Sequence, residues 1–182
     1  MSGGTGPLLD IPPVTQQQSN WCWSACGEMI FNYLHEPTRV DQSLLAEALL
    51  GMHCTADPGR CDVGISISQL LDLYSIMAVR YQALSGSLSA SKLRLEIDQK
   101  RPVHIGILWS SGSSGHMILL RGYVDDPTEG LWIDINDPLQ KADATSVSTE
   151  SESYWGCSYD ELLSYLGGTW LWSFAELQPE TP

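Results

Sequence analysis

The first half of the chain carries apolar residues at the spacing of three and four that is typical of amphipathic helices. One such run begins near Ser19 or Asn20, either of which could cap a helix, and continues through Leu34. Its apolar stripe, which should face a core, comprises Cys22, Cys26, Met29, Ile30 and Tyr33. Similar patterns predict further helices over residues 41–50, 67–76 and 90–99.

A different pattern begins after Pro102, where short β-branched or aromatic runs are bounded by Gly, Ser, Asp and Pro. The runs predict strands over residues 103–109, 117–123 and 131–136, a short helix over 159–166 and a final strand over 169–174. Helices therefore precede strands and do not alternate with them. This order predicts an α+β fold.

The length and composition suit a single domain. The chain has 182 residues, of which 43% are hydrophobic, and single domains usually hold ~100 to 200 residues. Gly and Pro are frequent in residues 1–13, which we expect to be a flexible lead. We place the domain over residues 14–177 and a flexible tail over residues 178–182.

The charge balance limits the classes of partner. Nine Lys and Arg against 22 Asp and Glu give a formal net charge of -13, which disfavours nucleic acid and anionic lipid. No stretch reaches the ~18 apolar residues of a membrane span, and residues 1–7 lack the pattern of a secretory signal. We expect a monomer that binds proteins, peptides or small molecules. We expect it in the cytoplasm, or exported by a route that needs no signal peptide.

Cys22 lies in the first turn of the first predicted helix. A thiolate is favoured there, because a helix N-terminus and a nearby imidazolium both stabilise negative charge. Gln16, six residues earlier, can return to the thiol across a loop and donate to a developing oxyanion together with the Cys22 backbone N–H. The alternatives are a buried, inert cysteine and a solvated loop amide.

Three segments together resemble papain-like cysteine peptidases. Gln16, five residues, Cys22, Trp23 and then small residues resemble the family's nucleophile segment. Gly115-His116 followed by an apolar run resembles the strand that supplies the base, and residues 131–138 resemble the strand whose end orients that base. The resemblance covers about half of the chain and is strongest to compact bacterial members, the staphopain-like and double-glycine-leader peptidases.

This resemblance implies a papain-like fold, with an N-terminal helical half packed on a C-terminal antiparallel β-sheet. It also implies peptide-bond hydrolysis of a protein or peptide substrate without a cofactor, with Cys22 as nucleophile, His116 as base, Asp137 as the orienting residue and Gln16 as oxyanion donor. Two alternatives remain: an acyltransferase or amidase that uses the same site, and a catalytically silent binding module.

The chain departs from the family pattern in three respects. The Cys-Gly-Ser-Cys signature is absent, and His116 follows Cys22 more closely than the ~130 to 150 residues seen in papain and cathepsins. The tryptophan expected two residues beyond the orienting residue is Leu139, so Trp132 or Trp155 should shield the catalytic hydrogen bond instead.

Three residues near the end of one predicted strand could orient His116. Side chains alternate between the two faces of a strand, so Asp137 points to one face while Asp134 and Asn136 point to the other. The family resemblance selects Asp137.

The remaining histidines and cysteines have other expected roles. His35, His53 and His104 lack the context of a catalytic base, so we interpret them as structural. Cys54 and Cys61 flank a tight Asp-Pro-Gly turn and could form a disulfide, remain free thiols or bind zinc, in that order of preference. A zinc site would need further ligands nearby, so we predict no metal.

Overall fold

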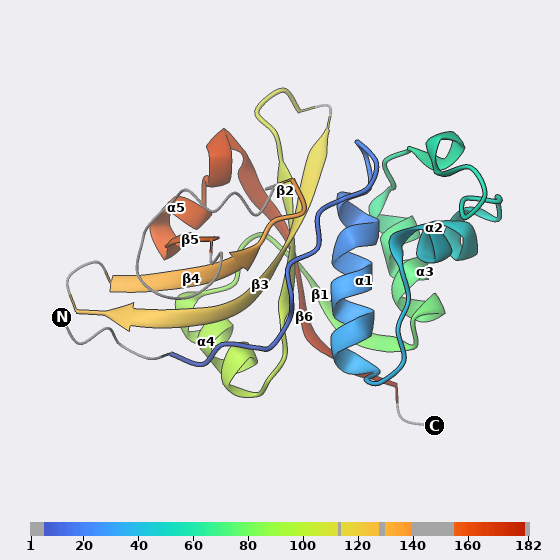
Figure 1. The fold of residues 1–182 in the computed structure, drawn as a ribbon. Coiled ribbons are helices and arrows are strands. Elements are labelled where there is room, and N and C mark those ends of the chain that lie inside the picture. The colour runs from blue at the N-terminus through green and yellow to red at the C-terminus, as the bar shows by residue number, and fades with distance from the viewer. Residues whose placement is uncertain (1–5, 113, 128–129, 140–154, 181–182) are drawn as a thin grey trace.

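The computed structural model describes residues 6–112, 114–127, 130–139 and 155–180. Its six strands form one sheet in the order β1-β6-β2-β3-β4-β5, in which every neighbouring pair is antiparallel. In Figure 1, α1, α2 and α3 group together to the right of the sheet, whereas α5 lies above β4 and α4 lies below β3 in the left half of the view. No helix in these ranges is both long and apolar enough to span a membrane.

The helices and strands have the following bounds. The helices are α1 (Cys22–Leu34), α2 (Gln42–Leu50), α3 (Ile67–Ile76), α4 (Ala90–Asp98) and α5 (Tyr159–Leu162), and two 3₁₀ turns are η1 (Pro58–Cys61) and η2 (Tyr165–Gly167). The strands are β1 (Val79–Ser85), β2 (Val103–Leu108), β3 (Gly115–Asp126), β4 (Gly130–Asn136), β5 (Trp155–Ser158) and β6 (Thr169–Pro179).

The predicted α+β arrangement is confirmed, but two strands were missed. β1 lies within the half that was expected to be helical, and it pairs with the C-terminal strand β6. Val79 is the only one of its seven residues that is buried, so the strand lacks the apolar alternation by which strands are recognised. β5 is four residues long and pairs with β4 at the far edge of the sheet.

Residues 7–11 are packed on the sheet, although a flexible lead was expected over residues 1–13. Leu8 forms an isolated bridge to Gly122, and the Leu9 N–H donates to the Arg121 carbonyl at 2.9 Å. The side chains of Leu9 and Ile11 are buried. These residues cover the edge of β3 beyond the end of β2, where backbone groups would otherwise lack partners.

The C-terminal tail is also shorter than expected. β6 continues to Pro179, which pairs with Val79 of β1, and the Glu180 N–H donates to the Ala78 carbonyl at 2.8 Å. Residues 1–5 and 181–182, the outermost parts of the expected lead and tail, lie outside the described ranges.

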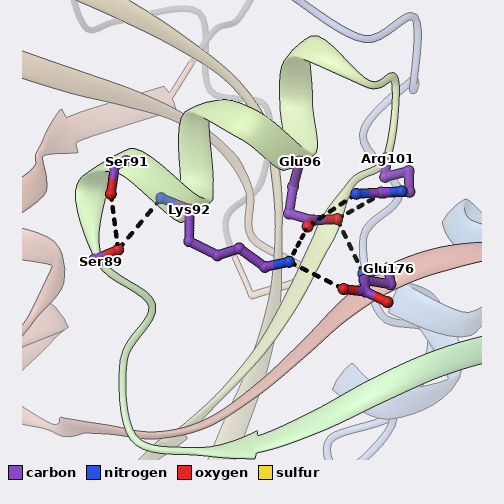
Figure 2. A network of polar contacts seen from close by, with 6 residues as sticks. All are labelled: Ser89, Ser91, Lys92, Glu96, Arg101 and Glu176. Atoms are coloured by element: carbon purple, nitrogen blue, oxygen red, sulfur yellow. Dashed lines mark hydrogen bonds and ion pairs between the residues drawn. The ribbon is translucent and has the colours of Figure 1, made fainter.

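A buried carboxylate joins α4 to the sheet (Figure 2). Glu96 has a fully buried side chain, which accepts two hydrogen bonds from Arg101 at 2.7 and 3.0 Å and contacts Lys92 at 2.9 Å. The Glu176 N–H of β6 also donates to it at 3.0 Å. Burial alone would raise the pKa of Glu96, but the hydrogen bonds from Arg101 and Lys92 lower it. The carboxylate therefore stays charged and connects α4 to β6.

Candidate active site

Helix α1 begins at Cys22, so its N-cap lies one or two residues later than the predicted Ser19 or Asn20. Its N-cap is Trp21, whose side chain makes no capping hydrogen bond. The side-chain amide of Asn20 donates instead to Asp62 Oδ1 at 3.2 Å. The first N–H groups of a helix have no partner within the helix. The partly exposed Cys22 thiol therefore lies at the positive end of an uncapped helix.

Two tryptophans fix the backbone on either side of Cys22. The Trp21 indole donates to the Cys61 carbonyl at 2.7 Å, and the Trp23 indole donates to the Val63 carbonyl at 3.0 Å. The segment around residues 61–63 thus supports the start of α1 from both flanks of the thiol.

Cys54 and Cys61 are joined by a disulfide, with their Cα atoms 5.7 Å apart. The first of the three alternatives for this pair is therefore the one observed. The disulfide closes the loop that leads into the supporting segment. Cys26 and Cys157 are free and buried.

His116 is the second residue of β3 and is almost fully buried, with 3% of its surface exposed. The preceding residue must be small, since a Cβ on Gly115 would lie 2.8 Å from the Ile107 carbonyl oxygen across the hairpin. His116 Nε2 lies 2.6 Å from Asp137 Oδ1. Burial lowers the pKa of His116, but hydrogen bonding with Asp137 and Cys22, together with their negative charge, raises it from 6.5 to about 9.

Asp137 and Asn136 point in opposite directions at the end of β4, as strand alternation predicts. Asp137 Oδ1 accepts from His116 and from the Leu139 N–H, the latter at 2.9 Å. Asn136 instead donates to the Ile11 carbonyl at 2.9 Å and so anchors the N-terminal segment. Asp137 therefore contacts the imidazole, whereas Asn136 holds the N-terminal segment.

Gln16 lies in the loop before α1, and the N–H groups of its side-chain amide face that loop. Nε2 donates to the carbonyls of Gln18 and Ser19 at 2.8 and 2.7 Å, and Oε1 is buried without a partner within the described ranges. Its backbone N–H donates to the Pro138 carbonyl at 2.9 Å. The loop that carries Gln16 is thereby tied to the strand end that carries Asp137.

Gln42, at the start of α2, holds this loop from the other side. Its buried side chain accepts from the Gln17 N–H at 2.9 Å and donates to the Thr15 carbonyl at 3.0 Å. Sequence reasoning did not identify Gln42, because no local pattern relates it to a loop about 25 residues away.

A groove of about 680 Å³ runs between the helical half and the sheet. One wall comes from residues 16–23 and 64–67, and the other from β2, β3 and β6. Cys22 and His116 both line it, and apolar side chains supply much of the remaining surface, including Ile65, Ile107 and Trp172. A chain bound in the groove would therefore lie beside the Cys22 thiol and the His116 imidazole.

Trp109 occupies the shielding position that we expected from another tryptophan. Its ring stacks on His116 with centroids 5.7 Å apart and planes inclined by 12°. Trp132 pairs with Val124, toward the opposite end of β3, and the Trp155 side chain lies outside the described residues. The register of the β2–β3 hairpin could have identified Trp109. Ile107 and Leu108 pair with His116 and Gly115, and Trp109 is the next residue after Leu108.

Tyr165 was also missed. Its hydroxyl donates to Asp137 Oδ2 at 2.9 Å, and it is buried. No motif or spacing in the sequence relates these two residues, which are 28 positions apart.

The other three histidines, His35, His53 and His104, do not line the groove. His104 is buried in β2, and its Nδ1 lies 2.7 Å from the Tyr74 hydroxyl. Burial lowers its pKa to about 3, so this ring is neutral in the physiological range. The His35 ring packs on Phe31.

Comparison with known proteins adds a family assignment and several structural neighbours. A family model described as papain-like cysteine protease AvrRpt2 matches residues 7–154. No curated protein matches the chain in sequence.

Three solved structures resemble the fold at 14% sequence identity. The peptidase domain of Streptococcus ComA, a bifunctional ABC transporter, has a TM-score of 0.58, and the match covers 92% of this chain and 97% of that one. A double-glycine-motif protease from an AMS/PCAT transporter, solved in complex with a leader peptide, has a TM-score of 0.51 and coverages of 96% and 98%. UfSP from C. elegans has a TM-score of 0.56, with coverages of 97% and 34%.

Proposed function

The chain belongs to the AvrRpt2 family of papain-like cysteine proteases, and we propose that it hydrolyses peptide bonds with Cys22 as nucleophile, His116 as general acid and base, and Asp137 as the residue that orients His116. The resemblance to papain-like cysteine peptidases is confirmed by that assignment. The observation that carries the assignment of roles is the 2.6 Å contact between His116 and Asp137 beside a thiol at an uncapped helix N-terminus.

The electrostatics support an ion pair in the resting enzyme. With the pKa of His116 raised to about 9, its ring is an imidazolium at neutral pH. That positive charge and the N-terminus of α1 both favour the Cys22 thiolate. The thiolate attacks the substrate carbonyl carbon and forms a tetrahedral oxyanion. His116 then gives its proton to the leaving amine as the C–N bond breaks, which leaves a thioester on Cys22.

The second half of the reaction uses the same groups in reverse. His116, now neutral, accepts a proton from water while the water oxygen attacks the thioester carbonyl. Collapse of this intermediate releases the carboxylic acid, and the proton on His116 restores the ion pair with the Cys22 thiolate. An amine or alcohol in place of water would make the same site an acyltransferase.

The oxyanion needs preorganised donors. The backbone N–H of Cys22 is one candidate, because it is the first residue of α1. We propose Gln16 as the other donor. In the absence of substrate, both N–H groups of Gln16 Nε2 are hydrogen-bonded, one to the Gln18 carbonyl and one to the Ser19 carbonyl. One of these two bonds must therefore break when substrate enters the groove.

Gln16→Ala should lower kcat by ~100-fold or more with little change in KM, because the lost hydrogen bond forms chiefly in the transition state. Steady-state kinetics on a cleaved peptide measures this effect. Gln17→Ala is the matched control, since the exposed side chain of Gln17 is next in sequence and its backbone N–H bond to Gln42 is unaffected. An equal loss in both variants would contradict the assignment of Gln16.

The peptidase assignment can be tested with a thiol-directed covalent peptidase inhibitor followed by intact-mass and peptide mapping. We expect a single adduct at Cys22, since Cys26 and Cys157 are buried. Slow labelling spread over several thiols would instead favour a binding module. Cleavage profiling on a peptide library then reports whether the products are free acids, as hydrolysis requires.

A further inference from the structure

A short turn between α5 and β6 contacts the His116–Asp137 pair from outside the groove. We propose that Tyr165, in this turn, is a positioning residue: its hydroxyl holds Asp137 Oδ2 so that Oδ1 faces His116, and the same turn seats Trp109 on the imidazole. The inference rests on the proposed function, because it assigns a role to Tyr165 through the pair that the mechanism uses.

The two carboxylate oxygens of Asp137 have different hydrogen-bond partners. Oδ1 lies 2.6 Å from His116 Nε2 and also accepts from the Leu139 N–H. Oδ2 accepts from Tyr165. The Asp137 side chain has no exposed surface, so water does not compete for these positions. A terminal carboxylate rotates easily about its last torsion, and a fixed donor on the second oxygen therefore fixes the direction of the first.

The turn that carries Tyr165 also determines how closely Trp109 approaches. A Cβ on Gly168 would lie 2.4 Å from Ile107 Cγ2 and 3.1 Å from Trp109 Cε3, so only glycine allows this packing. The hairpin holds Trp109 in return, since its N–H donates to the Ser114 carbonyl at 3.0 Å. Trp109 therefore lies next to both the turn and the imidazole.

The backbone of the turn supports a constrained role. Leu166, which follows Tyr165, has a φ of 49°, a left-handed conformation that non-glycine residues rarely adopt. The Gly168 N–H donates back to the Tyr165 carbonyl at 2.9 Å and closes the turn. Contacts on either side must hold this unfavourable conformation. The bond to Asp137 and the packing under Trp109 are two such contacts.

Excluding water matters for the pair as a whole. Hydrogen bonds to a charged group are stronger where the local dielectric is low. Trp109 covers one face of His116, and Tyr165 closes the far side of Asp137. Together they perform the shielding that the family's tryptophan at the position of Leu139 would provide.

Tyr165→Phe tests the role of the hydroxyl, because it keeps the ring and removes one donor. We expect kcat to fall by roughly 10- to 100-fold with KM unchanged, as for a small misplacement of a catalytic group. The rate of Cys22 alkylation by iodoacetamide should fall as well. Tyr159→Phe is the matched control, since the Tyr159 hydroxyl donates to the Leu88 carbonyl at 2.6 Å and does not contact Asp137. It should leave both rates unchanged.

A double-mutant cycle separates positioning from general stability. If Tyr165 acts through Asp137, adding Tyr165→Phe to Asp137→Ala should not change the alkylation rate further. The proposal is overturned if Tyr165→Phe behaves like Tyr159→Phe, or if it lowers the alkylation rate by the same factor in both backgrounds. Alkylation needs no substrate, so it tests this role even if the protein proves not to hydrolyse peptides. Failure of the proposed peptidase function would be seen separately, because the wild-type protein would then show no Cys22-dependent turnover of peptides.

Discussion

Cys22→Ala should abolish peptide hydrolysis while leaving the fold nearly unchanged. Alanine is well tolerated in the first turn of a helix, and no other group in the groove can form a thioester. Cys26 cannot substitute for Cys22: it is fully buried one turn further along α1, and burial raises its pKa well above the ordinary value. Turnover of a cleaved peptide and the thermal unfolding midpoint of the variant measure the two expectations.

Cys26→Ala provides the matched control for this prediction. It makes the same atomic change on the same helix, but in the core and away from the groove. It should cost some stability, on the order of 1 kcal/mol, and retain most of the turnover. Hydrolysis that survives in Cys22→Ala would refute the assignment of the nucleophile.

Asp137→Ala should lower kcat/KM by on the order of 10³- to 10⁴-fold, and Asp137→Asn by less. The alanine variant removes the group that orients the imidazole and leaves His116 Nε2 buried without this partner. The asparagine variant keeps an oxygen acceptor but loses the negative charge. Steady-state kinetics of both variants beside the wild type measures the difference.

Asn136→Ala is the neighbouring control. It should reduce stability by ~0.5–1.5 kcal/mol, because the buried Ile11 carbonyl loses one of two donors and keeps Arg121 Nη1 at 2.8 Å, while the catalytic rate changes little. Asp134 lies two residues before Asn136 in β4, opposite Gly122 of β3 and Gly156 of β5, and Asp134→Ala should also have a mild effect on turnover. If either variant proved more damaging to kcat/KM than Asp137→Ala, Asp137 would not be the orienting residue.

The pH profile of these variants follows from the raised pKa of His116. The protonated ring is needed to donate to the leaving amine, so wild-type kcat/KM should decline as the pH rises through about 9. Asp137→Asn removes a cause of the raised pKa, so this decline should move to lower pH. The same shift makes His116 contribute stability that is fully present below about pH 6.5 and lost as the pH rises through about 9.

Local pattern determined much of this protein. The spacing of apolar residues was sufficient to predict helices α2, α3 and α4 and strands β2, β3 and β4, because burial on one face imposes a period on the sequence. Strand alternation alone predicted that Asp137 and Asn136 diverge, and they do. The Gln-Cys-Trp and Gly-His segments indicated Cys22 and His116 as the proposed nucleophile and base because those proposed roles depend on a helix start and a strand start, which are local features.

Only the tertiary structure decided the remaining features. β1 has little apolar alternation of its own and exists through its pairing with β6. The engagement of Gln16 by its own loop, the support of that loop by Gln42, and the contacts of Trp109 and Tyr165 with the His116–Asp137 pair all depend on distances in the folded chain. Such contacts impose no period or motif on the sequence, because one favourable partner at one position is enough to form them.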